Sequence, residues 1–470
     1  MVPAAGRPWV AGVLRTARSA PGPLAARRHR GCEDRGVPQG PADASSSSDS
    51  PAAASVAPLL RPEGWALLEA LPPYAGPDAA MALGERLRAE GAEPQLVAAA
   101  MTQSRLRAKG EAKFGPFADG MLFTAEGLEQ ATRLQVAAHH AQRFRDAGCT
   151  RVADLGCGVG GDAMALASLG LGVLAVDRDE ATAAVATVNL RHWPEAQVHR
   201  ADVLDVITEL GRDGSVDGAW LDPARRTAAG RRVLDPHRAS PPWSAVLDVA
   251  RRVPATGVKL APGVPRDIAA GSGLPAEVQW VSVDGDVVEA ACWFGPLARP
   301  GRAASALVLR SAERGGTATL VDDDDLPVPP AVASPEGVGT YLYDPDGAVV
   351  RSGLVGQVAA LVGGSLLDPS IAYVTSDRLV ATPLARAFAV EEVWPFGLKA
   401  LRTRLRMRGV GAVEVLKRGS AVDVEQLRRS LRLEGARQAT LVLTRVAGRQ
   451  HVLLCRPVAT SVTTAGPPSS

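Results

Sequence analysis

Between residues 151 and 262, short apolar runs alternate with longer segments in which apolar residues recur every three or four positions. This alternation predicts strands joined by helices, which form a parallel sheet with helices on both faces. The predicted strands cover residues 151–156, 173–177, 196–202, 216–222 and 257–262. The predicted helices between them cover residues 160–170, 180–193, 203–211 and 241–253.

The segments on either side of this region extend the α/β unit. Residues 128–148 have helical periodicity and end at Gly148, a residue type that often terminates helices. Residues 277–295 contain two strand-like runs around the turn sequence "DGD", which predicts a β-hairpin. We therefore expect an α/β domain over residues 116–300, in which a parallel sheet ends in an antiparallel hairpin.

The remaining segments differ from this domain in composition. Residues 1–55 form a low-complexity leader that cannot bury a core, and residues 56–115 are predicted to form a helical N-terminal module. Residues 301–395 contain isolated strand-like runs and are expected to be a β-rich connecting region. Residues 396–460 alternate helices and strands in a smaller domain, and residues 461–470 form a disordered tail.

The composition excludes several classes of protein. The chain has no apolar stretch of 18 residues, so we expect no transmembrane helix. The five cysteines form no Cys-x-x-Cys pair, which argues against a disulfide framework and favours a cytoplasmic location. The seven histidines do not accompany cysteine or acidic clusters, so no metal site is expected. Residues 1–31 contain arginines and no acid, which leaves an organellar transit peptide as an alternative reading of the leader.

The sequence "VADLGCGVGGD" places an acid and several glycines between a predicted strand and a predicted helix. Gly156, Gly158 and Gly160 let the backbone approach a ligand closely at the start of the helix. The turn also fits the G-x-G-x-x-G pattern of dinucleotide-binding folds, so the glycines alone leave NAD as an alternative cofactor.

Four successive strands carry an aspartate at or near their ends, namely Asp154, Asp177, Asp202 and Asp222. In a parallel α/β sheet, ligands bind at this edge. Asp177 follows the glycines by about twenty residues, where a carboxylate can bind ribose hydroxyls, with Asp179 as the alternative. Asp202 ends the third strand, where its carboxylate can accept a hydrogen bond from an adenine amino group.

The stretch "DLGCGVGG" resembles motif I of S-adenosylmethionine-dependent methyltransferases. Residues 121–223, from "LFTAEGLEQA" through "CGVGG", resemble the corresponding block of the trimethylguanosine synthase branch. The last 75 residues resemble a THUMP-like domain, and the chain from about residue 56 is similar to a bacterial family that combines the two.

This resemblance implies a class I methyltransferase fold, Rossmann-like, with a helical N-terminal module and an α+β C-terminal domain. It also implies S-adenosyl-L-methionine as the cofactor, and a place in the cofactor pocket for Thr124. Asp154 would reach the amino-acid moiety of that cofactor, which NAD lacks.

The stretch "LDPARR" matches part of a motif that resembles amino-directed methyltransferases, in which Asp/Asn/Ser-Pro-Pro-aromatic follows the fourth strand. In that motif the side chain and a proline carbonyl accept hydrogen bonds from the target amino group. Asp222 and Pro223 match, but Ala224 replaces the second proline and Arg225 replaces the aromatic residue, so aromatic stacking is lost. Arg225 is instead a candidate substrate-binding residue, whose planar guanidinium would stack on a base or bind an RNA phosphate. Lys259 ends the fifth strand, where it would either contact substrate or neutralise Asp222.

Residues 399–437 contain eleven Lys and Arg residues against four acids. In the predicted helix over 398–409, Leu398, Leu401 and Leu405 are expected to be buried. Basic residues on the opposite face suit contacts with RNA phosphates. The candidates are Lys399, Arg402, Arg406 and, on the next strand, Lys417.

The sequence therefore predicts an S-adenosylmethionine-dependent methyltransferase that acts on RNA, either tRNA or rRNA, at a base nitrogen. Two alternatives stay open at this point. One is a non-catalytic RNA-binding protein that retains the fold, and the other is a methyltransferase of small molecules.

Overall fold

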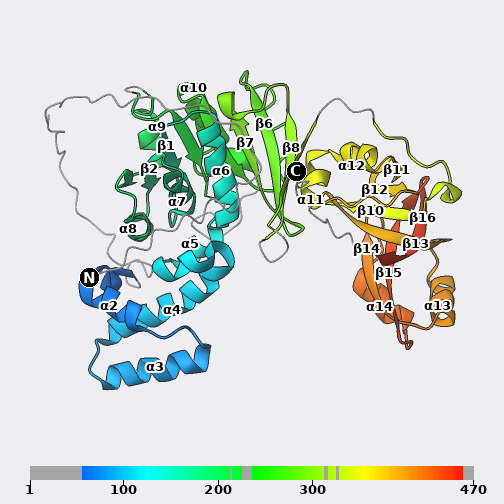
Figure 1. Cartoon of the computed structure of the whole chain (residues 1–470), viewed down its shortest axis with the longest axis horizontal. Coiled ribbons are helices and arrows are strands. Elements are labelled where there is room, and N and C mark those ends of the chain that lie inside the picture. The colour runs from blue at the N-terminus through cyan, green and yellow to red at the C-terminus, as the bar shows by residue number, and fades with distance from the viewer. Residues whose placement is uncertain (1–55, 212–213, 225–234, 312–315, 324–327, 459–470) are drawn as a thin grey trace, which may run out of the picture.

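The computed structural model describes residues 56–211, 214–224, 235–311, 316–323 and 328–458. In this part of the chain the strands form two sheets, one of nine strands and one of seven. Helices precede the first sheet, cover it, and separate it from the second sheet (Figure 1). The predicted leader and tail lie outside the described residues.

The nine-stranded sheet has the strand order β3-β2-β1-β4-β5-β7-β6-β8-β9. Its first five strands in the chain pair in parallel, and β7 runs antiparallel between β5 and β6. This is the predicted parallel sheet with a terminal hairpin. The strands are β1 (Arg151–Leu155), β2 (Gly172–Asp177), β3 (Ala196–Arg200), β4 (Gly218–Leu221), β5 (Ala255–Leu260), β6 (Ala276–Val283), β7 (Asp286–Phe294), β8 (Ala304–Leu309) and β9 (Ala318–Asp322).

Helices cover this sheet because their small and apolar residues pack against strands that are buried on both faces. Within α7, seven of the eight residues are buried, and the predominance of alanine allows this close packing. The elements that follow β1 are α7 (Gly161–Ser168), α8 (Glu180–Asn189), α9 (Val203–Ile207), η4 (Pro236–Arg238), α10 (Trp243–Arg252) and η5 (Gly295–Leu297).

The helix predicted over residues 128–148 is in fact two helices. The observed helices are α5 (Ala125–Gln130) and α6 (Leu134–Asp146), and the backbone of Ala131 between them is extended. Helical periodicity continues through the break, so the pattern gave no sign of it. The carbonyl groups at the break are bound by lysine side chains from distant parts of the chain, as described below.

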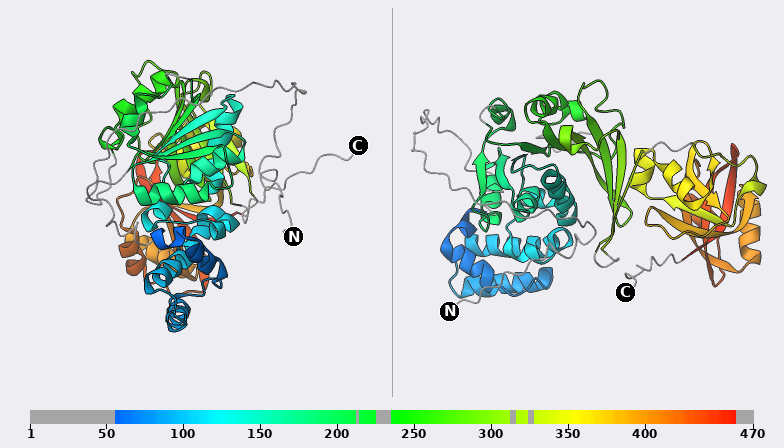
Figure 2. Two further views of the ribbon diagram at one scale, coloured as in Figure 1. Left: turned by 90° about the vertical axis from the view of Figure 1, so that its left-hand side faces the viewer. Right: turned by 45° about the horizontal axis from the view of Figure 1, so that its top comes forward.

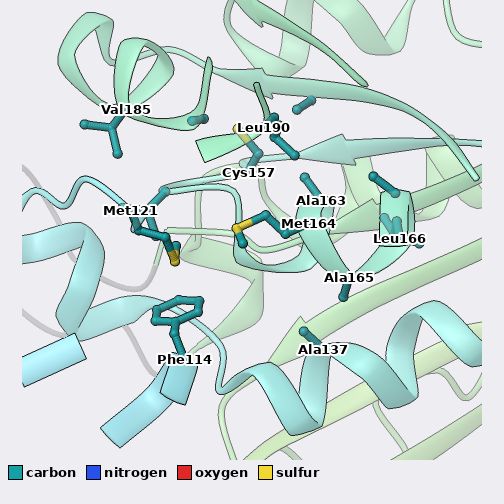
Figure 3. Close-up of a cluster of buried hydrophobic side chains, with 14 of the residues drawn as sticks. Phe114, Met121, Ala137, Cys157, Ala163, Met164, Ala165, Leu166, Val185 and Leu190 are labelled. Atoms are coloured by element: carbon teal, nitrogen blue, oxygen red, sulfur yellow. The ribbon is translucent and has the colours of Figure 1, made fainter. Parts of the chain in front are cut away.

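The N-terminal module consists of η2 (Ala57–Leu60), α2 (Pro62–Ala70), α3 (Pro77–Ala89), α4 (Pro94–Phe114) and η3 (Gly115–Gly120). Its core is continuous with one face of the first sheet. Figure 3 shows Phe114, at the end of α4, beside Met121 and facing α7, where Met164 lies. A Cβ atom on Gly161 would lie 3.3 Å from the Phe114 ring, so a small residue allows this close contact.

The seven-stranded sheet has the order β11-β12-β10-β13-β16-β15-β14. Its strands are β10 (Tyr341–Pro345), β11 (Ser365–Asp368), β12 (Ile371–Ser376), β13 (Ala385–Pro395), β14 (Val410–Lys417), β15 (Arg437–Val446) and β16 (Arg449–Pro457). The associated helices are η7 (Pro335–Gly337), α11 (Gly347–Ser352), α12 (Val355–Val362), α13 (Leu398–Met407) and α14 (Val424–Leu431).

The expected connecting region over residues 301–395 is therefore not one unit. Strands β8 and β9 extend the first sheet, whereas β10 to β13 form more than half of the second sheet. Strand β13 pairs with β16, which joins this region to the C-terminal residues in one hydrogen-bonded sheet. The correction arises because strand partners are set by long-range pairing, which short apolar runs do not reveal.

Helices α11 and α12 lie between the two sheets and share one apolar core with both. Figure 1 and the right-hand view of Figure 2 place the N-terminal helices and the second sheet on opposite sides of the first sheet. Among the described residues, no helix combines the length and apolar character needed to cross a bilayer.

Candidate functional site

A cavity of about 650 Å³ lies at the carboxyl edge of the parallel strands. Its size falls within the range of small-molecule and cofactor sites. The glycine turn after β1 and the residues that follow β2, β3 and β4 line it, and Thr102 and Leu106 of α4 also contribute to its wall. The N-terminal module is therefore part of the cavity, a role that the sequence did not predict.

The glycine turn lies against the end of β4. Gly156 has a φ of +90°, and a Cβ atom there would lie 2.9 Å from the Asp222 carbonyl oxygen. Gly158 and Gly160 also have positive φ angles, of +54° and +85°. The backbone N–H of Gly158 donates to the Asp177 carboxylate over 3.0 Å. Glycine at position 156 thus permits the close contact between the cofactor turn and the residue predicted to bind substrate.

Asp154 is 1% exposed, and its Oδ2 has no hydrogen-bond partner among the described residues. Its pKa is raised well above the usual value, first by burial and then by the charges of Asp162, Asp222 and Asp177. This buried oxygen has other carboxylates nearby and lacks the hydrogen-bond donor or positive charge that would compensate for its burial. This environment suits a cationic ligand.

Asp177 and Asp202 both line the cavity, at the ends of β2 and β3. Burial raises the pKa of Asp177, although the backbone N–H groups of Asp179 and Gly158 oppose this by donating to its carboxylate. Asp202 caps α9 by accepting a hydrogen bond from the Leu204 N–H over 2.9 Å. Asp179, the alternative to Asp177, caps α8 through Thr182 over 2.8 Å, so it already has a structural role.

Thr124 also lines the cavity, as expected. Its side chain caps α5 by accepting a hydrogen bond from the Gly127 N–H over 3.0 Å. Phe123, the residue before it, is fully buried, and its backbone N–H and C=O both form hydrogen bonds with the Gln103 side chain of α4. Thr124 therefore forms part of the cavity wall, and the hydrogen bonds of Phe123 attach this segment to the N-terminal module.

Asp222 forms an ion pair with Lys259, with 2.7 Å between Oδ2 and Nζ. The two side chains are 24% and 7% exposed, which makes Lys259 the buried partner. The Lys259 ammonium also donates to Thr132 Oγ1 over 2.9 Å and to the Gln130 carbonyl over 3.3 Å. Of the two roles considered for Lys259, the structure places it as the partner of Asp222.

The residues after Asp222 are positioned by a different contact. Pro223 is buried, and Ala224 donates its backbone N–H to the Ser240 carbonyl over 2.8 Å. A proline at position 224 could not make this bond, so the departure from the Pro-Pro motif has a local structural consequence. Arg225 lies outside the described residues.

Lys113 binds the connection between α5 and α6 from the other side. Its ammonium donates to the Glu129 carbonyl over 2.6 Å and to the Ala131 carbonyl over 2.7 Å. Burial and, after it, the positive charge of Lys259 lower the pKa of Lys113 to about 8. The break in the helix, and with it this part of the cavity wall, is thus held by two lysines.

His140 forms an unpredicted buried ion cluster behind the cavity. Its Nδ1 lies 2.8 Å from Asp162, and its Nε2 lies 2.7 Å from Glu289 of β7. Burial alone would lower the pKa of His140, but Glu289 and Asp162 together raise it to about 9. Because ionised carboxylates only accept hydrogen bonds, the ring is an imidazolium that donates to both. Asp162 lines the cavity, so the cluster borders the site.

The four basic residues predicted to bind RNA from the C-terminal region differ in whether their charged groups already form hydrogen bonds within the chain. Lys399 is exposed on α13. Arg402 is half-buried and donates to the Ser430 carbonyl, and Arg406 donates to the Arg432 carbonyl over 2.8 Å. Lys417 donates to the Val422 carbonyl over 2.8 Å.

The outward basic face expected on α13 is thus partly used to bind the end of α14. The helical pattern placed Arg402 opposite the leucines, but α14 packs against that side. Leu401 and Leu405 are buried as predicted, whereas Leu398 is 39% exposed.

Sequence reasoning missed Thr132, Lys113 and the partners of His140. Only the scarcity of lysine gave a signal for Lys113, because five lysines remain in a chain with 52 Lys and Arg residues. In the part of the chain that the structure describes, no three His, Cys, Asp or Glu side chains are arranged to hold a metal ion.

Comparisons with known proteins agree with this geometry. The chain is 39% identical over 343 residues to two S-adenosylmethionine-dependent methyltransferases from Mycobacterium tuberculosis, strains CDC 1551 and H37Rv. Each alignment covers 72% of this chain and 89% of the relative.

Domain and structure comparisons add to this. Residues 385–457 match the THUMP domain-like family, and residues 52–110 match a domain of unknown function. The fold is similar to a crystal structure described as a methyltransferase from Porphyromonas gingivalis W83. That structure has a TM-score of 0.64 and 20% identity, with 81% of this chain and 99% of that chain covered.

Proposed function

Because the chain belongs to the family of S-adenosylmethionine-dependent methyltransferases, we propose that this enzyme methylates a base nitrogen of RNA, with Asp222 positioning that nitrogen. The observation that carries the proposal is the Asp222 carboxylate. It lies at the end of β4, against the glycine turn, and Lys259 holds one of its oxygens. Its other oxygen accepts no hydrogen bond from the described residues.

The cavity residues fit the cofactor of this family. S-adenosylmethionine supplies an activated methyl group on a positively charged sulfur, and it also carries an ammonium group. The unpartnered Asp154 oxygen and the nearby carboxylates of Asp162, Asp177 and Asp222 favour such a cation. Gly156 and Gly158 would lie beside it, Asp177 would bind its ribose and Asp202 its adenine. Thr124 would belong to the wall that encloses it.

Methyl transfer from a sulfonium requires alignment more than acid–base power. In our proposal Asp222 Oδ1 accepts a hydrogen bond from the target amino group, which orients the nitrogen lone pair toward the methyl group. The Pro223 carbonyl is the second acceptor. Lys259 is a positioning residue, because it fixes the Asp222 carboxylate relative to Thr132 and the α5–α6 connection.

RNA is proposed as the substrate because residues 385–457 match the THUMP domain-like family and carry much of the basic stretch 399–437. A small-molecule substrate is the second candidate, and one observation favours it. Arg402, Arg406 and Lys417 all donate to carbonyl groups of their own chain, so fewer cations remain for phosphates than the sequence suggests.

The experiment follows transfer of tritiated methyl groups from S-adenosylmethionine to total RNA and, separately, to RNA-free cell extract. We expect label in RNA, and a loss of at least about 10²-fold in Asp222→Ala, which removes the acceptor, because a misplaced nucleophile loses this much rate. Asp146→Ala is the matched control, since Asp146 is exposed at the far end of α6.

Cofactor binding is measured by calorimetry on the same proteins. Asp222→Ala should bind S-adenosylmethionine as the wild type does, whereas Asp154→Asn should bind it more weakly. Label that appears only in the RNA-free extract would refute the RNA proposal, and full activity in Asp222→Ala would refute the role of Asp222.

A further inference from the structure

Three basic side chains lie close to residues that line the cavity, where α4 meets the α5–α6 connection. They are Lys109 and Lys113 on α4 and Arg133, which precedes α6. We name this group the basic rim. It belongs to the N-terminal side of the molecule, whereas four of the expected RNA contacts, Lys399, Arg402, Arg406 and Lys417, lie on the second sheet and its helices.

The position of Lys109 follows from the helix that carries it. Thr102 and Leu106 line the cavity, and Lys109 lies seven and three residues beyond them on α4. At 3.6 residues per turn, residues with these spacings share one side of a helix. Leu106 is buried and Lys109 is exposed, so this side of α4 extends from the cavity wall at Leu106 to the protein surface at Lys109.

The other two members lie close to Lys109. The Lys113 ammonium is fixed to the Glu129 and Ala131 carbonyls, and Arg133 reaches the Ala112 carbonyl at 3.5 Å. After burial, the charges of Lys259, Arg133 and Lys109 lower the pKa of Lys113, and the charge of Glu129 opposes them. Lys259 is already paired with Asp222, so the rim itself consists of the other three cations.

Two of the three rim cations, Lys109 and Arg133, have no carboxylate partner among the described residues. Lys109, Lys113 and Lys259 are also three of only five lysines in the chain. Like charges placed together without partners repel one another, so they indicate a surface that an anion covers.

We propose that the basic rim binds the phosphodiester backbone of the RNA substrate beside the target nucleotide. The proposal rests on the proposed function, because it assumes that a base enters the cavity. A base inside the cavity leaves its flanking phosphates at the border, and Lys109 and Arg133 are the cations that can reach them there. The N-terminal module would thus position the substrate, in addition to the THUMP-like domain.

The test measures binding of the full chain to a fluorescein-labelled single-stranded RNA as salt is varied. In Lys109→Gln and Arg133→Gln, we expect roughly tenfold weaker binding for each variant. The slope of log K against log salt should fall by about 0.7 for each contact removed. Arg145→Gln is the control, because it removes one exposed charge from the last turn of α6 and should leave both values unchanged. Binding of S-adenosylmethionine, measured by calorimetry, should be unchanged in all three variants.

The outcomes separate this proposal from the proposed function. If the wild type methylates RNA and the rim variants keep its affinity and salt slope, the rim proposal is wrong and the function stands. If the wild type methylates only small molecules, the proposed function is wrong, and the rim proposal, which assumes an RNA substrate, is wrong with it. A wild type that binds no RNA overturns the rim proposal.

Discussion

Replacing His140 by glutamine tests the buried ion cluster behind the cavity. The substitution removes the imidazolium and leaves the carboxylates of Asp162 and Glu289, which lie 2.8 and 2.7 Å from its ring, without a counter-charge. Both acids are almost fully buried, at 10% and 3% side-chain exposure. An uncompensated buried charge is strongly destabilising, typically by about 3–5 kcal/mol.

The pKa of His140 gives a second measure of this effect. In the folded protein it is raised from 6.5 to about 9. At 1.36 kcal/mol per unit, the difference corresponds to about 3 kcal/mol. For a unit of about 150–250 residues, each kcal/mol shifts the melting temperature by roughly 2–4 °C. We therefore expect His140→Gln to melt roughly 6–12 °C below the wild type at pH 7.

The sign of the pH dependence follows from the direction of the shift. Because the folded-state pKa is raised, the stabilisation is complete below pH 6.5 and is lost as the pH rises through 9. The difference in melting temperature between wild type and variant should therefore shrink by more than half between pH 7 and pH 10.

Thermal unfolding can be followed by tryptophan fluorescence, because the Trp220 and Trp293 rings lie 4.2 and 5.7 Å from the His140 ring. His139→Gln is the control, since burial lowers the pKa of His139 to about 4 and leaves it neutral. A difference below 2 °C at pH 7, or one that stays constant up to pH 10, would refute the reasoning.

Two further substitutions test the glycine turn and the C-terminal helices. Gly156→Ala should weaken S-adenosylmethionine binding in calorimetry and lower methyl transfer by roughly 10²-fold. The reason is that φ at this position is +90° and the new Cβ atom would lie 2.9 Å from the Asp222 carbonyl oxygen. Wild-type binding and activity in this variant would contradict the prediction. Arg402→Gln should destabilise the second sheet unit by about 1–2 kcal/mol in thermal unfolding, because Ser430 loses its charged donor, and should leave the salt dependence of RNA binding unchanged. A changed salt slope with unchanged stability would instead make Arg402 an RNA contact.

The α/β domain and its cofactor edge could be predicted because both depend on local patterns. Alternating apolar runs and helical segments predict a parallel sheet, and parallel strands place their carboxyl ends along one edge. Asp154, Asp177, Asp202 and Asp222 could thus be grouped before their side chains were seen. The glycine turn completed the group, since a side chain at Gly156 would collide with the backbone at the end of β4.

The remaining features depend on contacts between residues that are far apart in the sequence. His140 and Glu289 are separated by 149 positions, and no local pattern connects them. Strands β8 and β9 look like any other short apolar runs, so their assignment to the first sheet required the pairing itself. On α13, the helical pattern predicted Leu401 and Leu405 correctly as buried and Leu398 wrongly, and it could not show that α14 covers Arg402.

The two lysines at the α5–α6 connection explain why this break in the helix matters for the site. Lys113 binds the carbonyls of Glu129 and Ala131, and Lys259 binds that of Gln130 together with the Asp222 carboxylate. A compact ammonium can donate to acceptors in several directions, whereas the planar guanidinium of arginine donates within one plane. Lysine therefore suits both positions in a chain that otherwise relies on arginine. Through these bonds the orientation of Asp222 depends on a bend that α4 also holds, so the N-terminal module supports the acceptor as well as the cavity wall.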